Sequence, residues 1–223
     1  YETAFPVSSR RHGAWSVEPS GDYAFSAKVN SVPLMAVEFP PAAAEYAIVF
    51  AGNEDGIMPV VILGMRGNQN VYLSPQGGWQ AKYIPAFIRR YPFIFSSDQQ
   101  GKTLTLCIDE AYKGCNQEGR GQKLFGEDGK PTAYVDNVLK FLQNYQAQFQ
   151  RTKVFCAKLK EYDLLEPMQA QVTTPKGEKI SLNGFLSVSR EKLRQLGGDA
   201  LATLAKTGAQ SENWMQVAIR TPS

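Results

Sequence analysis

Residues 131–167 decide the fold class, and they read PTAYVDNVLKFLQNYQAQFQRTKVFCAKLKEYDLLEP. Large apolar side chains recur here at the three-to-four-residue spacing that places them on one face of a helix. We therefore predict one long helix, or two consecutive helices, that begins after Pro131-Thr132 and ends by Pro167. The positions that form the apolar face are Val135, Val138, Leu139, Leu142, Tyr145, Phe149, Phe155, Leu159 and Tyr162.

Upstream of this helix the sequence is typical of β-strands. Residues 46–51 and 59–65 are short runs rich in Val and Ile, and the turn-forming stretch 52–56 separates them. Residues 69–73 predict a further hairpin partner, and 83–90 predict a short helix with Pro85 in its first turn. Two more strands, at 93–95 and 103–108, flank a turn at 99–101, whereas residues 1–22 and 109–130 are expected to be polar and irregular.

Downstream of the helix the pattern returns to strands and then to helices. Residues 169–174 and 179–188 predict a hairpin, and Ser189 is the expected N-cap of a helix at 190–196. A second helix is expected at 200–206, followed by a strand or short helix at 214–219. Strands and helices do not alternate regularly, which favours an α+β fold over α/β. We predict a mostly antiparallel sheet with a long central helix and a C-terminal segment of hairpin plus helices. We predict a single domain over residues 1–223. Within it, residues 168–223 either pack with the rest of the chain or form a small C-terminal lobe.

Composition and charge exclude several classes of protein. With 223 residues and 43% hydrophobic residues, the chain has enough apolar material for a substantial core. Its 24 basic and 21 acidic residues form no dense basic face, so nucleic acid is not an expected partner. No apolar run approaches the roughly 18–20 residues that a membrane helix needs. Three cysteines without a Cys-x-x-Cys pair predict neither a disulfide framework nor a zinc ribbon, and favour a reduced, cytoplasmic location.

Few residues carry a recognisable catalytic pattern. His12 is the only histidine, and a hydrogen-bonded structural role is favoured over catalysis. Cys115 lies beside Lys113, whose charge could lower the pKa of the thiol. The loop carboxylates are interpreted as solvated charges rather than as a metal site. We predict no catalytic residue, no metal and no cofactor. The carboxylates in question are Asp109, Glu110, Glu118, Glu127 and Asp128.

The best functional lead is a cluster of aromatic and basic residues in the predicted helix at 83–90 and around it. Helical spacing brings several of these side chains near one face, where rings would stack on a ligand and an arginine would pair with a carboxylate. The alternative is structural, with the rings as core anchors and the arginines at the C-terminal end of the helix. The predicted ligand-binding residues are Trp79, Tyr83, Phe87, Arg89, Arg90 and Tyr91.

A series of short motifs resembles the SapC family of bacterial proteins. They include Asn30-Ser31-Val32-Pro33-Leu34, Glu38-Phe39-Pro40, Tyr46-Ala47-Ile48-Val49-Phe50, Leu63-Gly64, Asn70-Val71-Tyr72, Gly78-Trp79 and the string YIPAFIRRYPF at 83–93. Weaker similarity continues through Leu124-Phe125, Leu164-Leu165-Glu166-Pro167 and Gly184-Phe185-Leu186, and so covers nearly the whole chain. Order and spacing make this resemblance specific.

The resemblance implies an accessory protein of Gram-negative bacteria, often encoded near outer-membrane receptors and oxygenase- or halogenase-like enzymes. Together with the aromatic cluster, it predicts a non-catalytic protein that recognises a peptide, a protein or a small ligand. Two alternatives stay open: an enzyme or enzyme partner that acts on a peptide or small molecule beside such an oxidative enzyme, and a structural component of a surface layer.

Overall fold

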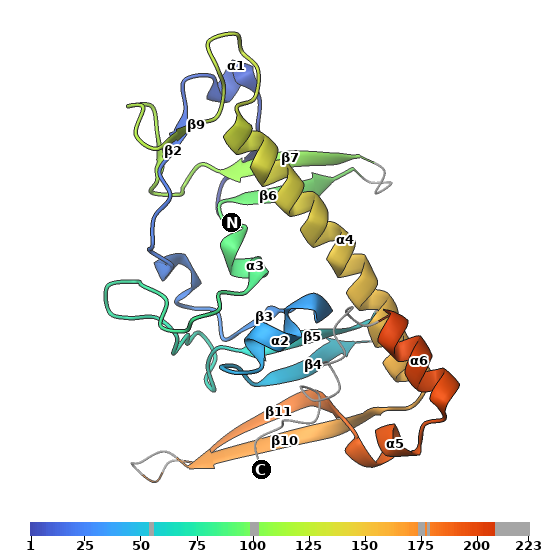
Figure 1. Ribbon diagram of the computed structural model, residues 1–223. Helices are drawn as coiled ribbons and strands as arrows, with labels where there is room; N and C mark the ends of the chain where they lie inside the picture. The colour runs from blue at the N-terminus through green and yellow to red at the C-terminus, as the bar shows by residue number, and fades with distance from the viewer. Residues whose placement is uncertain (54–55, 99–102, 174–176, 178, 208–223) are drawn as a thin grey trace. The chain divides into compact units, whose positions relative to one another are not determined.

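The computed structural model describes residues 1–53, 56–98, 103–173, 177 and 179–207 (Figure 1). The chain forms two compact units, and each is built from two separated segments. Unit 1 comprises residues 1–21 and 89–146, and unit 2 comprises residues 22–88 and 147–223. Strand pairs in the described residues are all antiparallel, and the longest element is a helix, so the α+β prediction is confirmed. The expectation of a single domain stays a prediction.

Helix α4 (Ala133–Glu161) is one continuous helix of 29 residues, the longer of the two predicted alternatives. Its first turn begins where the Asp136 N–H donates to the Thr132 carbonyl, at 3.1 Å. The helix ends before Pro167, because Asp163 adopts a left-handed backbone with φ 53° and the Leu164 N–H bonds to the Leu159 carbonyl. The first half of α4 supplies Val135 and Leu142 to the core of unit 1. The second half supplies Phe155, Cys156 and Leu159 to the core of unit 2.

Unit 1 contains two small sheets, both drawn in Figure 1. One has the order β1 (Ala4–Pro6), β7 (Leu104–Asp109) and β6 (Phe93–Ser97). The other places β2 (Ser16–Val17) between β8 (Cys115–Asn116) and β9 (Gln122–Lys123), and α1 (Ser9–His12) precedes it. The expectation of irregular structure at 1–22 and 109–130 is therefore wrong in part. These pairings are two or three residues long, too short to leave a periodic pattern in the sequence.

Unit 2 is built on a five-stranded sheet. Short helices and the second half of α4 contribute to the core on one face, which includes Phe39, Phe50, Val61, Phe155 and Leu204. The opposite face carries Val49, Val60 and Ile62 with Phe185. The strand order is β10 (Leu165–Thr173), β11 (Lys179–Val188), β4 (Ile48–Asn53), β5 (Gly56–Ile62) and β3 (Ser31–Pro33). The helices are η1 (Ala24–Ser26), η2 (Ala36–Glu38), α2 (Phe39–Ala42), α5 (Arg190–Gln195) and α6 (Gly198–Thr207).

Two local predictions are wrong. Residues 69–73 form a turn and not a strand, because Asn68 has a left-handed backbone (φ 57°) and the Asn70 side chain accepts the Tyr72 N–H at 3.0 Å. The helix predicted at 83–90 shortens to α3 (Ala86–Arg89), directly after Pro85. Several expected segments lie wholly or partly outside the described residues: the turns at 52–56 and 99–101, Pro175-Lys176, and the element at 214–219.

Candidate functional site

The six predicted ligand-binding residues divide between the two units. The boundary falls inside α3, after Ile88. Trp79, Tyr83 and Phe87 therefore belong to unit 2, whereas Arg89, Arg90 and Tyr91 belong to unit 1. Each group has its own neighbours within its own unit, and the two are described separately.

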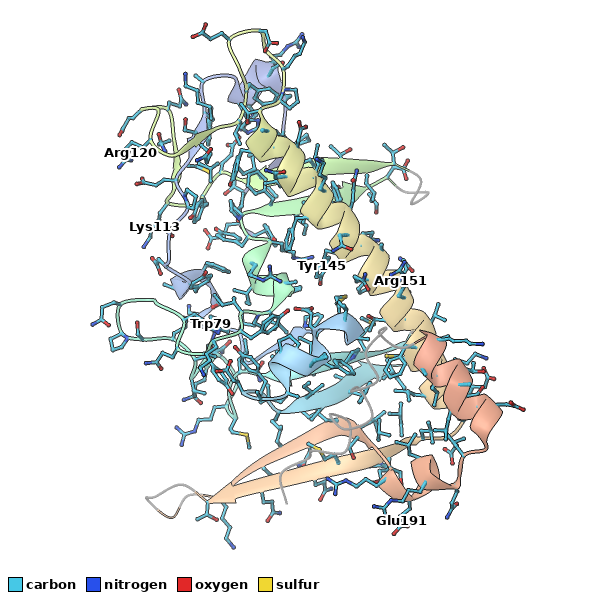
Figure 2. All side chains as sticks on the ribbon, in the orientation of Figure 1. Trp79, Lys113, Arg120, Tyr145, Arg151 and Glu191 are labelled. Atoms are coloured by element: carbon cyan, nitrogen blue, oxygen red, sulfur yellow. The ribbon has the colours of Figure 1, made fainter. Side chains whose placement is uncertain are left out.

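In unit 2, Trp79 lies in a group of aromatic rings that we call the Trp79 cluster: Tyr23, Phe25, Tyr46, Tyr72 and Trp79. Figure 2 labels Trp79, which lies in the loops that precede α3. Its ring lies edge-on to Tyr23, with centroids 5.7 Å apart, and stacks on Tyr72 at 6.3 Å. Tyr72 in turn contacts Tyr46 at 4.7 Å, and Tyr23 contacts Phe25 at 6.3 Å. These separations lie within the range of favourable aromatic pairs.

Hydrogen bonds hold the rings of the Trp79 cluster in place. The Trp79 indole N–H donates to the Tyr46 hydroxyl at 2.8 Å, and that hydroxyl donates to the Tyr83 carbonyl. The Tyr72 hydroxyl donates to the Glu45 carbonyl at 2.8 Å. Burial above all raises the pKa of the Tyr46 and Tyr72 hydroxyls, which therefore stay neutral donors. The polar ends of Trp79, Tyr46 and Tyr72 are thus tied to the protein, and the apolar parts of these rings are what they can offer to a ligand.

Two glutamates anchor the chain around the cluster. Glu45 accepts the backbone N–H groups of Lys82 and Tyr83, both at 2.9 Å, and these bonds lower its pKa. Glu38 is only 4% exposed and accepts three donors. These are the Met35 N–H at 2.9 Å, the Tyr83 hydroxyl at 2.6 Å and the Ala86 N–H at 2.8 Å. These bonds hold the backbone and the hydroxyl of Tyr83 in place, and its assignment as a ligand-binding residue stays a prediction.

Two apolar side chains extend the Trp79 cluster to the solvent. Phe25 is 42% exposed and Val71 is 55% exposed. The segments that carry them are joined, because the Asn70 side-chain amide donates to the Ser26 carbonyl at 3.3 Å and to its hydroxyl at 3.2 Å. Phe25 and Val71 directly adjoin these bonded residues. The Phe25 ring contacts Tyr23, which contacts Trp79. We refer to these three residues and Val71 as the Phe25–Val71 surface.

In unit 1, Arg90 and Tyr91 lie among tyrosines. The Arg90 guanidinium lies 5.2 Å from the ring centre of Tyr145 and 5.8 Å from that of Tyr1. Figure 2 labels Tyr145 on α4. Tyr91 contacts Tyr1 at 5.4 Å and Tyr112 at 5.5 Å. Burial, with the nearby Asp109 carboxylate, raises the pKa of Tyr91 to about 12. Arg89 is exposed, and its guanidinium lies 5.4 Å from the ring centre of Phe141.

The other candidate groups have structural surroundings. His12 is fully buried, its Nδ1 accepts the Ser8 N–H at 3.3 Å, and its Nε2 lies 3.1 Å from the Glu110 carboxylate. The expectation that Lys113 lowers the pKa of Cys115 is wrong, because burial and then the Asp109 and Glu110 charges raise it to about 11. Asp109 is buried, contrary to the solvated-charge interpretation. Among the described residues, no three His, Cys, Asp or Glu side chains are grouped to hold a metal ion.

Several site residues escaped the sequence prediction. Tyr23, Phe25 and Tyr46 lie more than 30 positions before Trp79 in the chain, so no local spacing joins them to it. The Asn70-Val71-Tyr72 and Gly78-Trp79 motifs of the family resemblance mark other residues of the site. A sequence motif does not show, however, that its residues contact those of another motif. Asp109 was visible only as one of several loop carboxylates.

The sequence model of the family described as SapC matches residues 7–217 of the chain. No curated protein and no solved structure matches. In the part of the chain that the structure describes, no helix is both long enough and apolar enough to cross a membrane.

Proposed function

The chain belongs to the SapC family, and we propose that it is a non-catalytic accessory protein that binds a peptide or protein segment through the Phe25–Val71 surface. One observation carries this proposal. The exposed side chain of Phe25 contacts the Tyr23 ring, and the exposed Val71 directly precedes Tyr72 in the chain. The polar atoms of Trp79, Tyr46 and Tyr72 in this group of rings are already hydrogen-bonded within the protein.

Such a surface suits binding because some of its aromatic side chains are already fixed in one position before a ligand arrives. Association costs side-chain entropy for each group that it immobilises, about 0.5–1.5 kcal/mol for a flexible side chain. The indole of Trp79 and the phenol of Tyr72 are held by hydrogen bonds, so their immobilisation adds little to this cost. Aromatic residues also supply large contact areas and are enriched among the residues that dominate binding energy. An apolar or aromatic side chain of a partner would contact the exposed parts of Phe25 and Val71.

The experiment compares two double variants of the full chain. Peptides are first selected from a random displayed library on the wild-type protein, and their affinities are measured by fluorescence anisotropy. Phe25→Ser with Val71→Ser should weaken the selected peptides at least tenfold, a loss of about 1.4 kcal/mol in binding free energy. The control pair, Leu104→Ser with Val154→Ser, removes exposed apolar side chains elsewhere, 42% and 53% exposed, and should change affinity less than twofold. Equal affinity for both double variants would reject this surface as the site.

Two of the ligand-binding residues predicted from the sequence, Arg89 and Trp79, are tested in the same assay. Arg89→Ala removes an exposed guanidinium of unit 1, and Trp79→Phe retains an aromatic ring in unit 2 while removing the N–H that Tyr46 accepts. Loss of binding in Trp79→Phe alone would favour the unit 2 surface. Loss in Arg89→Ala alone would move the proposed site to unit 1.

A further inference from the structure

Residues 1–7 pair with strand β7 of unit 1. We propose that the surface they cover, which we call the groove and which consists of β7 with Asp109, Tyr91 and Arg11, is a peptide-binding site, occupied in cis by the 1–7 segment. In trans it accepts an extended peptide with aromatic side chains four positions apart. The inference goes beyond the proposed function and does not depend on the Phe25–Val71 surface.

The segment adds a strand to the edge of a sheet. β1 pairs antiparallel with β7, in the register Ala4 to Asp109, Phe5 to Ile108 and Pro6 to Cys107. Main-chain hydrogen bonds continue on both sides of β1, with the Val7 N–H to the Leu106 carbonyl at 2.8 Å and the Glu110 N–H to the Thr3 carbonyl at 3.0 Å. Addition of an extended peptide to a sheet edge is a common mode of recognition, because the main chain supplies affinity whatever the sequence.

A buried carboxylate recognises the main chain beyond the strand. Asp109 is 1% exposed, and its Oδ2 accepts the Glu2 N–H at 2.9 Å while its Oδ1 accepts the Thr3 N–H at 3.1 Å. The third donor is the Ala111 N–H, also to Oδ1, at 3.1 Å. If the segment left, two of these three donors would leave with it, and a buried charge with missing donors is costly. The groove therefore favours an occupant with two consecutive free N–H groups.

Two aromatic side chains of the segment have defined partners on unit 1. The Tyr1 ring contacts Tyr91, and its hydroxyl donates to the Phe93 carbonyl at 3.0 Å. The Phe5 ring lies under the Arg11 guanidinium, whose carbon is 3.8 Å from the ring centre. Arg11 is fixed in turn by hydrogen bonds to Glu110. Tyr1 and Phe5 are four positions apart in the segment, which gives the spacing of the aromatic side chains in the proposed occupant.

The 1–7 segment is held weakly enough for another peptide to replace it. Glu2, Thr3, Ala4 and Pro6 are exposed, so the segment buries little apolar area and depends on main-chain bonds. Segments of this kind open locally at a free energy below that of global unfolding. A tethered occupant acts at an effective concentration of roughly millimolar, so it hides the groove from a weak competitor. Opening the cis segment should therefore expose the site.

The test uses the full chain with proline at position 3. Thr3→Pro removes the N–H that Asp109 accepts, whereas the control Thr3→Ala retains it. The probe is an N-acetylated peptide of sequence YETAFPV with a fluorophore at its C-terminal end. Thr3→Pro should bind the probe at least tenfold more tightly than the wild type or Thr3→Ala. A probe with proline for its threonine should bind at least tenfold more weakly. Phe25→Ser with Val71→Ser, added to Thr3→Pro, should leave probe affinity unchanged, which separates this site from the proposed function.

Two results would overturn the proposal. The first is a folded Thr3→Pro chain that binds the probe no better than the wild type. The second concerns the wild type alone and so holds even if Thr3→Pro fails to fold. The Glu2 and Thr3 amides should exchange with deuterium at least tenfold faster, after correction for intrinsic rates, than the Asp109 amide of β7, which donates to the Pro92 carbonyl at 2.9 Å and not to the segment. Equal opening rates for all three would mean that the segment leaves only when the unit unfolds.

Discussion

Replacement of Glu38 by glutamine tests how strongly one buried carboxylate organises the loops of unit 2. The glutamine side chain is nearly isosteric but has a single oxygen. If that oxygen takes the Oε1 position, it retains the hydrogen bonds from the Tyr83 hydroxyl and the Ala86 N–H. The new side-chain NH2 group then faces the Met35 N–H, and because both are donors, the Met35 N–H loses its partner.

The cost follows from these contacts. An unpaired buried donor costs about 1–3 kcal/mol, and hydrogen bonds to a neutral acceptor are weaker than those to a carboxylate by about 1 kcal/mol each. With one donor unpaired and two bonds weakened, we expect Glu38→Gln to lower the free energy of unfolding by about 3–5 kcal/mol. Tyr83→Phe removes one of the retained donors, so the two substitutions should be non-additive in a double-mutant cycle.

The assay is urea unfolding followed by far-UV circular dichroism. Glu191→Gln is the matched control, because Glu191 is exposed on α5, and its effect should stay within about 0.5 kcal/mol. If the two units unfold in separate transitions, only the transition of unit 2 should move. A loss below about 0.5 kcal/mol for Glu38→Gln would refute the claim that its three hydrogen bonds hold these loops.

Four further outcomes are expected. Trp79→Phe should cost about 1 kcal/mol in urea unfolding, the usual worth of the indole bond to Tyr46, and no loss would contradict that bond. Gly77→Ala should destabilise at least about 1 kcal/mol more than Gly129→Ala. Both glycines have positive φ, but only at Gly77 would a Cβ meet the Asp22 carboxylate, 2.2 Å away. Alkylation of Cys115 by iodoacetamide at pH 7.5, followed by mass spectrometry, should run at least about 100-fold slower than that of a free cysteine. Its rate should rise with pH towards the pKa of about 11, and a fast reaction at neutral pH would contradict the raised pKa. Arg11 above all lowers the pKa of Glu110, so the stability that wild type has over Glu110→Gln should be complete above pH 4.5 and shrink on further acidification. A stability difference between wild type and Glu110→Gln that grows as the pH falls would contradict a lowered pKa for Glu110.

The sequence predicts the long elements of the fold well because long elements repeat their pattern. Helix α4 has an apolar residue at every turn, and the β4–β5 and β10–β11 hairpins carry continuous Val- and Ile-rich or alternating runs. The strands β1, β2, β8 and β9 have at most three residues, and their partners lie about a hundred positions away in the chain. Such pairings depend on tertiary contact, which a local pattern does not encode.

The candidate site was predictable only in its centre. Trp79 stood out as an aromatic beside glycines, but its neighbours Tyr23 and Tyr46 come from distant segments. The apparent helical face that joined Tyr83 to Arg90 and Tyr91 does not exist, because α3 is only four residues long. The sequence-based prediction of a lowered pKa for Cys115 also failed. The charge of the nearby Lys113 matters less than burial of the thiol and the proximity of the Asp109 and Glu110 carboxylates.

The chain passes between the two units three times, after residues 21, 88 and 146. Any contiguous stretch of the sequence that contains one whole unit therefore also contains part of the other, and a gene fragment that encodes either half of the protein encodes parts of both. A protease that cuts once, after Ile88, would leave each unit as two fragments associated without a covalent link. The third passage lies within α4, so a ribosome must complete this helix before unit 2 can close its core with Phe155 and Leu159. Both units are consequently finished late in synthesis, and during translation the partly made chain exposes apolar strands that await their partners.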